Sequence, residues 1–289
     1  MSLSRVALPI MVVFAFLGGC SKTGDAAPQT KADQPKAAEA PPQKTGLKFD
    51  SKRLKFVQGM LLDDLIHSAQ EDTALTEKSE ALRRLNITDS VEAKALAKDY
   101  LENEAKADRK YKAHGGRILI SGTVESISDG FKEGLPYFAS LRGYGALKSI
   151  FIKSNGDATG ASSSLKRGRK AFFVCTIENH SADQVVASCS TLEQYAKSPE
   201  VRASYDQYVA SLLSGKKQVV NEGFLKVFLT CYAVSKRLPD DSPCFVELDD
   251  ACDRQLNRIG NVDLSPEEDA EIEEIIRNNI SFDEPAKLK

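Results

Sequence analysis

The stretch "RILISGTVESI", residues 117–127, decides the fold of this chain. Its aliphatic and β-branched residues alternate in part with small and polar ones, which is typical of a β-strand. Gly122 lies in the middle, where a glycine indicates a bend or bulge of the kind that a tight barrel uses. The stretch therefore predicts the first strand of a small barrel.

More strands are predicted after this one. We expect them over residues 135–141, 147–153, 170–177 and 184–190, with a short helical turn over 159–165. Five short strands with a small helix between the third and the fourth follow the order of the OB-fold. Such barrels bind oligonucleotides and oligosaccharides through the face of their second and third strands.

The residues that lead into the first strand resemble the tRNA_anti-like family of OB-fold domains. The matching residues in 99–127 are Asn103-Glu104, Ala107-Asp108, Tyr111-Lys112 and Gly122-Thr123-Val124. Further matches are Leu165-Lys166 and Gly168 before the fourth strand and a Cys-Ser-Thr-Leu sequence at the end of the fifth. The resemblance covers about residues 90–192 and implies an OB-like barrel, and the stretches 113–116 and 142–145 depart from the family pattern.

Helices are predicted on both sides of the barrel. Before it we expect helices over 52–70 and 76–85, then a longer one that begins at Asp89 or Ser90 and ends at Gly115-Gly116. After it we expect four helices, over 198–215, 224–234, 246–258 and 265–278. The fold class is therefore α+β, a five-stranded OB-like β-barrel flanked by N-terminal and C-terminal helices.

The first nineteen residues have the layout of a secretory signal. Arg5 supplies a positive charge, and the apolar run of residues 6–16 is too short for a stable membrane span. The sequence Leu17-Gly18-Gly19-Cys20 resembles the bacterial lipobox, which implies that Cys20 becomes the lipidated N-terminus. Because Ser21 rather than Asp follows the cysteine, the enterobacterial sorting rule implies the outer membrane. The alternative is an ordinary signal peptide with an incidental cysteine.

The segment after Cys20 has the composition of a tether. Residues 21–46 are rich in Ala, Pro, Lys, Gln and Thr, and such a segment cannot bury enough apolar surface to fold. We predict a signal peptide over 1–19, a lipidated cysteine and tether over 20–46, N-terminal helices over 47–116, an OB-fold-like domain over 117–192 and a C-terminal helical region over 193–289.

An exported chain meets an oxidising compartment, so the remaining cysteines are candidates for disulfides. Cys175 and Cys189 flank the last predicted hairpin, where they lie opposite each other across two strands. We expect a disulfide there, the alternative being two buried thiols. Cys231 could pair with Cys252 in a helical hairpin or with Cys244, which leaves one thiol over.

The candidate binding face lies on the second and third strands and in the adjoining loops. Its residues are Tyr137, Phe138, Arg142, Tyr144, Lys148, Phe151 and Lys153. Aromatic rings interleaved with cations suit stacking on single-stranded nucleic acid or on sugars, and Lys166-Arg167-Gly168-Arg169-Lys170 adds a basic run. The alternative is that the aromatic residues fill the barrel core and the cations are solvated.

Charge and motifs narrow the function. The 39 basic and 41 acidic side chains nearly balance, which excludes a nucleic-acid-binding protein that is strongly basic over its whole chain. Three scattered histidines and cysteines without a CxxC unit indicate no metal site, and Asp63-Asp64 beside His67 is best explained as a solvated helix face. No cofactor motif and no catalytic constellation is found, so we expect no enzyme.

We therefore predict a non-catalytic, lipid-anchored lipoprotein of the cell envelope, on the periplasmic face of the outer membrane. Its OB-like module would bind an envelope protein or polymer. A single-stranded nucleic-acid-binding module exported to the envelope is the alternative, and a hydrolase that acts on the envelope comes third.

Overall fold

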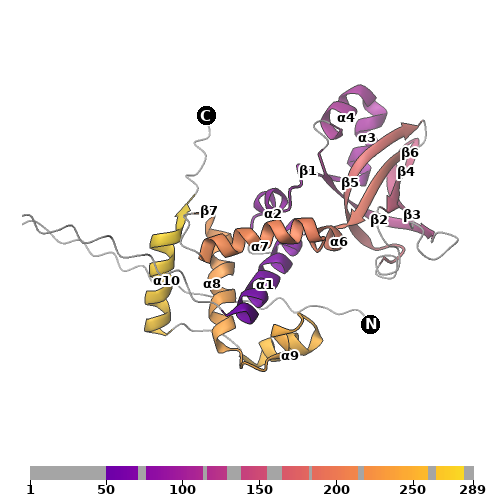
Figure 1. The fold of residues 1–289 in the computed structure, drawn as a ribbon. Coiled ribbons are helices and arrows are strands. Elements are labelled where there is room, and N and C mark those ends of the chain that lie inside the picture. The colour runs from indigo at the N-terminus through magenta and orange to yellow at the C-terminus, as the bar shows by residue number, and fades with distance from the viewer. Residues whose placement is uncertain are drawn as a thin grey trace, which may run out of the picture.

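The computed structural model describes residues 50–70, 76–112, 116–128, 138–154, 165–181, 184–213, 218–259 and 265–282. The predicted leader, tether and most of the helical turn over 159–165 lie outside them. The fold is α+β, with a closed β-barrel at one end and a helical body at the other (Figure 1).

The barrel has the strand order of an OB-fold. Its strands are β2 (Ile118–Ser128), β3 (Phe138–Tyr144), β4 (Leu147–Ser154), β5 (Lys170–Ser181) and β6 (Gln184–Thr191). They are joined in the order β2-β3-β4-β6-β5, and β5 pairs with β2 to close the barrel. The pair β4–β6 is parallel, whereas the other pairs of the closed barrel are antiparallel. The five predicted strands are all present, but the second, predicted over 135–141, is described over 138–144, and residues 135–137 lie outside the described ranges.

The long first strand of the barrel, β2, pairs with two of the other barrel strands. Residues 118–123 pair with β5, and residues 124–128 pair with β3. The register shifts between Val124 and Ser126, which is a bulge. Gly122 lies just before this change of partner, and a Cβ added there would be 2.9 Å from Cβ of Ala93. A glycine is needed here because a helix approaches the strand closely.

The prediction of one long helix from Asp89 or Ser90 to Gly115-Gly116 is wrong. Residues Asp89–Glu92 form a strand, β1, parallel to the start of β2. The helix then runs in two pieces, α3 (Ala93–Glu102) and α4 (Glu104–Tyr111), because Asn103 has an extended backbone and its side chain caps α4. Strand pairing with a distant residue overrides the local capping signal.

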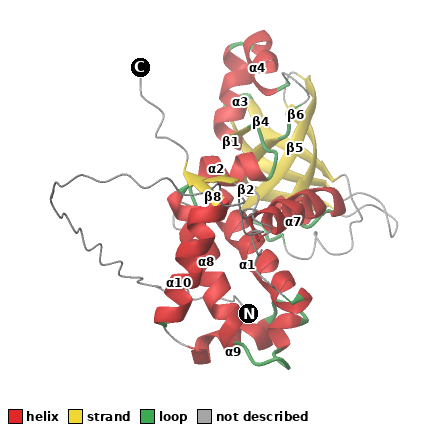
Figure 2. Cartoon of the chain, turned by 60° about the vertical axis from the view of Figure 1, so that its left-hand side comes forward, coloured by secondary structure: helices red, strands yellow, loops and turns green. Residues whose placement is uncertain are grey.

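Helices α3 and α4 belong to the barrel rather than to the helical body (Figure 2). Leu96, Tyr100 and Tyr111 are buried in the same core as the inward side chains of the strands. The helices α1 (Ser51–Gln70) and α2 (Lys78–Arg84) pack instead into the second core. The segment over 47–116 thus contributes to both cores.

The helical body is built around α1. Its other elements are α6 (Leu192–Ala196), α7 (Pro199–Leu213), α8 (Glu222–Arg237), the 3-10 turn η2 (Pro243–Phe245), α9 (Asp250–Ile259) and α10 (Pro266–Asn279). Helix α1 packs against α2, α7 and α8. A short parallel pair, β7 (Gln218–Val220) with β8 (Ile280–Phe282), completes the body.

The barrel and the helical body share apolar contacts. Leu119 of β2 and Val174 of β5 are buried in the helical core, outside the barrel's own core. Nη1 of Arg117, directly before β2, donates a hydrogen bond to the Tyr195 hydroxyl of α6 at 3.3 Å. These contacts join the two parts because residues from the outer surface of the barrel become core residues of the other part.

The structure contains two disulfides among its described residues. Cys175–Cys189 joins register partners of β5 and β6, as predicted. The second bond is Cys244–Cys252, so both expected pairings of Cys231 are wrong. Cys231 is buried in α8, whereas η2 and the first turn of α9 bring Cys244 and Cys252 together over a short loop.

Candidate binding face of the barrel

The outer surface of β3 and β4 carries the candidate site. Along β3 the side chains of Ala139 and Leu141 are buried, whereas Arg142 and Tyr144 are exposed. Alternation of this kind places successive side chains on opposite faces of a strand. The strand therefore presents its polar and aromatic residues outward.

The outward side chains of the two strands lie side by side. Ser140 is the register partner of Phe151, and Arg142 is the register partner of Ser149. The hydroxyls of Ser126 in β2 and Ser140 are 2.8 Å apart, which extends the face onto a third strand. Side chains directly opposite on one face of an antiparallel pair are in contact range. The face is thus a continuous strip of polar groups around one aromatic ring.

Both outward cations of this strip have acidic neighbours. Nε of Arg142 lies 3.0 Å from the Glu125 carboxylate, and Nζ of Lys153 lies 3.9 Å from that of Glu178. Arg142 keeps 59% of its side chain exposed, so this pair is a solvated one. The face is polar, but its charges are compensated.

An exposed apolar patch adjoins the strip at the β3–β4 turn. Tyr144 is 51% exposed and Leu101 of α3 is 40% exposed. Leu101 lies beside the turn, because its Cδ1 is 3.3 Å from the position of a Cβ added to Gly145. Gly145 has a φ of +59°, in the left-handed region that favours glycine. Lys148 is exposed on the other side of this turn.

The structure thus groups most of the sequence-predicted residues. Arg142, Tyr144, Phe151 and Lys153 lie on the outer surface of β3 and β4, with Lys148 at their turn. Tyr137 lies outside the described residues, and only the backbone of Phe138 is described. The sequence did not lead us to predict Leu101 as part of the site. The available signal was that this apolar residue falls outside the apolar face of its helix, which indicates exposure.

The family-matching residues 103–112 lie elsewhere, at the start of α4 and along it, where α3 and α4 cover the barrel. The Tyr111 hydroxyl donates to Asp99 at 2.6 Å, and the Tyr100 ring stacks on His180 of β5 at 5.1 Å. Nδ1 of His180 lies 3.3 Å from the Glu104 carboxylate. Burial and the bond to Asp99 raise the pKa of Tyr111 to about 12. These groups fasten the broken helix to the barrel and so have a structural role.

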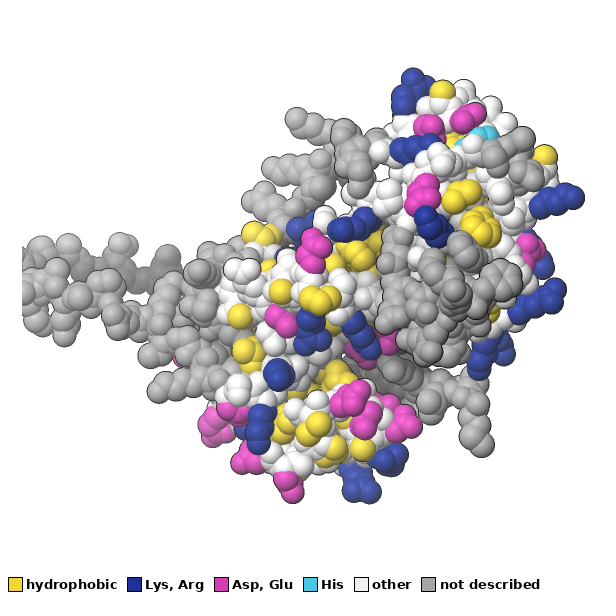
Figure 3. Space-filling view, turned by 45° about the vertical axis from the view of Figure 1, so that its right-hand side comes forward, with side chains coloured by type: hydrophobic (Ala, Val, Ile, Leu, Met, Phe, Trp, Pro, Cys, Tyr) yellow, Lys and Arg dark blue, Asp and Glu magenta, His cyan; other side chains and the backbone are white. Residues whose placement is uncertain are grey.

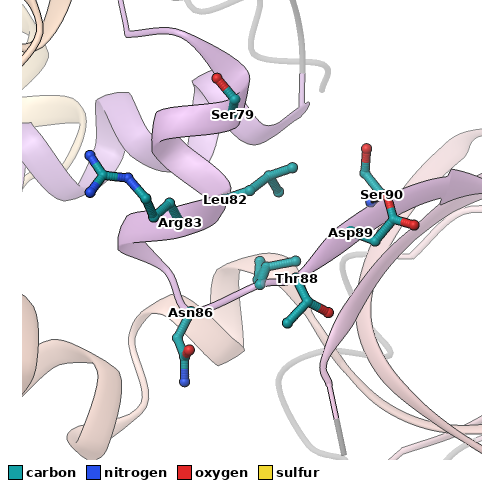
Figure 4. Close-up of a pocket in the computed structure, with 8 residues that line it drawn as sticks. Ser79, Leu82, Arg83, Asn86, Thr88, Asp89 and Ser90 are labelled. Atoms are coloured by element: carbon teal, nitrogen blue, oxygen red, sulfur yellow. Dashed lines mark hydrogen bonds between the residues drawn. The ribbon is translucent and has the colours of Figure 1, made fainter. Parts of the chain in front are cut away.

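A second concavity lies between α2 and β1 (Figure 4). It is an open cleft of about 430 Å³, lined by Ser79, Leu82, Arg83, Asn86, Ile87, Thr88, Asp89 and Ser90. Figure 4 shows Leu82 pointing into the space and Arg83 pointing away from it. Arg83 forms an ion pair with Glu80, 3.0 Å away. The cleft is open to solvent, and Arg83 is paired with Glu80 instead of turning toward it, so β3 and β4 offer the better site.

No group of three or more His, Cys, Asp or Glu side chains among the described residues could hold a metal ion. None of the helices in the described ranges is both long and apolar enough to cross a membrane.

The chain matches a known family over its N-terminal two thirds. The model of the tRNA_anti-like family matches residues 1–191. No curated protein and no solved structure matches the chain. The matched region ends at Thr191, the last residue of β6, so it includes the whole barrel and leaves out α6 to β8.

Proposed function

This chain belongs to the tRNA_anti-like family, and from that premise we propose that it is a non-catalytic lipoprotein of the cell envelope. Its OB barrel is a binding module, and we propose that the outer face of β3 and β4 binds a protein or an envelope polymer. Strands 2 and 3 of OB-folds form their usual binding face, and here these strands are β3 and β4.

Charge compensation on the face is the observation that carries this proposal. Arg142 and Lys153 both have a carboxylate nearby, Glu125 and Glu178 respectively. A face for nucleic acid needs cations that replace the counterions of the phosphates. A polar strip beside an exposed apolar patch suits a protein surface or an uncharged polymer instead.

The two disulfides and the lipobox-like sequence both support a location in the cell envelope. Disulfides persist in oxidising compartments such as the periplasm, and this chain has Cys175–Cys189 and Cys244–Cys252. The lipobox-like residues before Cys20 supply the anchor, and Ser21 favours the outer membrane. The partner is therefore sought among proteins and polymers that face the periplasm.

The anchor is tested by labelling cells with radioactive palmitate. We expect the wild-type chain to be labelled and to sediment with membranes, and the Cys20→Ala chain to be unlabelled and released. A Cys20→Ala chain that stays in the membrane fraction, together with an unlabelled wild type, would refute the lipid anchor.

Binding of single-stranded nucleic acid is the alternative function. It is favoured by the half-exposed ring of Tyr144 beside the exposed Lys148, a pair that could stack on a base and contact a phosphate. Oligonucleotide binding that weakens steeply with salt, and is lost on replacing Arg142 and Lys148, would favour this alternative. Weak binding that does not depend on these residues would favour the protein or polymer partner.

A further inference from the structure

The turn before β5 is a concentrated basic surface. Lys166, Arg167, Arg169 and Lys170 are all exposed, and Gly168 lies between them. Within the ranges that the structure describes, none of these four cations forms an ion pair, in contrast to Arg142 and Lys153 on the binding face. In Figure 3, Lys and Arg side chains line the outer edge of the barrel.

The backbone of this turn is fixed to the barrel. The Gly168 amide donates to the Val124 carbonyl at 2.8 Å, and the Val124 amide donates to the Arg169 carbonyl at 2.9 Å. The Arg169 amide closes the turn by donating to the Lys166 carbonyl at 3.1 Å. Gly168 has a φ of +78°, which a side chain would disfavour. The cations therefore start from a fixed place beside β2.

We propose that this basic turn binds the phosphate groups of anionic phospholipids and holds the barrel against the membrane surface. The inference rests on the proposed membrane attachment, to which it adds a second contact. Clusters of four or more Lys and Arg side chains near a membrane surface are attracted to anionic lipids, and each cation contributes separately. A lipid anchor combined with a basic patch is a common two-part attachment.

A membrane fits this turn better than a nucleic acid does. Single-stranded nucleic acid needs exposed rings on which its bases stack, as well as cations. Phe172, two residues after the turn, is half-buried against the helical core, and its ring centre lies 5.1 Å from Nζ of Lys170. Charge alone is sufficient for anionic lipids, and charge is what the turn offers.

Vesicle flotation of the full chain with Cys20→Ala tests the inference without the lipid anchor. The vesicles are phosphatidylcholine with or without phosphatidylglycerol, and the readout is the ratio of the two partition coefficients. We expect a clear preference for phosphatidylglycerol that salt weakens. The double variant Lys166→Gln/Arg167→Gln should lose about 25-fold of that preference, about fivefold for each cation.

A matched control separates the turn from the net charge. Lys55 in α1 and Arg254 in α9 are exposed and belong to the helical body. The double variant Lys55→Gln/Arg254→Gln removes the same charge, and its preference for phosphatidylglycerol should stay within about twofold of the parent chain.

Three results would overturn the inference. The first is equal partition to both kinds of vesicle, and the second is an equal loss in the two double variants. The third is tighter binding to an oligothymidylate than to the anionic vesicles, lost in Lys166→Gln/Arg167→Gln, which would assign the turn to nucleic acid. Failure of palmitate labelling would refute the lipid anchor. It would not affect the flotation result, because the flotation experiment uses the Cys20→Ala chain, so the two proposals can fail separately.

Discussion

The Tyr100 hydroxyl of α3 donates a 2.9 Å hydrogen bond to the Asp108 carboxylate of α4, across the break at Asn103. Asp108 is also 2.9 Å from Nζ of Lys112. Asn103, Asp108 and Lys112 are among the residues by which the sequence resembles its family. Here they shape a broken helix that closes one end of the barrel, so this part of the family pattern marks a fold element.

Removing the Tyr100 hydroxyl should weaken this closure. Tyr100→Phe leaves the ring in the core and deletes a hydrogen bond to a charged acceptor, which costs about 2 kcal/mol of unfolding free energy. Urea unfolding measures this loss. Tyr144→Phe is the matched control, because its hydroxyl is on an exposed residue, and it should change stability by less than about 0.5 kcal/mol. Equal effects of the two changes would contradict the role of Tyr100.

Acid should unfold the barrel end of the molecule. The hydrogen bond from Tyr111 lowers the pKa of Asp99, and the bond from Lys112 lowers that of Asp108. A lowered pKa in the folded state gives stability that is present above the unfolded pKa of about 3.9 and is lost as pH falls through the folded pKa. Urea unfolding at a series of pH values should show this loss, and a smaller one in Asp108→Asn. A pH dependence that Asp108→Asn leaves unchanged would exclude Asp108 as a source.

Alkaline pH should destabilise the folded protein in part by ionising Tyr111. Its pKa is raised to about 12 by burial and by Asp99, so the neutral phenol is favoured in the folded state. The stability that this gives is complete below the unfolded pKa of about 10 and is lost as pH rises toward 12. Absorbance titration at alkaline pH should show several late phenols, because burial also raises the pKa values of Tyr100, Tyr205 and Tyr208. Tyr111→Phe should have one late phenol fewer than the parent chain. Titration of every phenol near pH 10 in the folded protein would contradict this.

A methyl group at position 122 should be poorly tolerated. In Gly122→Ala the new Cβ would lie 2.9 Å from Cβ of Ala93 and 3.3 Å from Cβ of Leu141. Overpacking of this kind costs about 1–3 kcal/mol. Adding Ala93→Gly removes the closest contact, so the double variant should lose less stability than the sum of the two single changes. Strict additivity in urea unfolding would show that helix α3 does not cause the constraint.

The free thiol of Cys231 should be unreactive until the protein unfolds. Cys231 is buried in α8, and desolvation raises its pKa well above the usual range for a thiol. The thiolate is the reactive form, so alkylation of the native chain should leave Cys231 unmodified. Mass spectrometry after alkylation in denaturant, without reductant, should find Cys231 modified and the two disulfides intact. Rapid modification of Cys231 in the native chain would contradict its burial.

The sequence predicted the barrel well, because local alternation and turn residues define β2 to β6 within a short stretch. It failed at β1, since residues 89–92 carry a good helix-capping signal and become a strand only through pairing with residues 118–121. The Cys175–Cys189 bond followed from the hairpin, whereas Cys244–Cys252 depended on how η2 turns into α9.

The candidate face could be predicted only in part, for a similar reason. Arg142, Tyr144, Phe151 and Lys153 follow from alternation along two neighbouring strands. The acidic partners of Arg142 and Lys153 are Glu125 and Glu178, which lie on other strands. The charge compensation therefore appears only once the strand register is known. Leu101 reaches the face because α3 packs beside the β3–β4 turn, which no local pattern encodes.

Crosslinking in cells tests the binding face of β3 and β4 most directly. A photoreactive amino acid replaces Tyr144 in one chain and Val219 of β7 in a matched chain, since both side chains are about half exposed. We expect one dominant adduct with an envelope protein or polymer from position 144 and none from position 219. No adduct from position 144, or the same adduct from both positions, would contradict the assignment of β3 and β4 as the binding face.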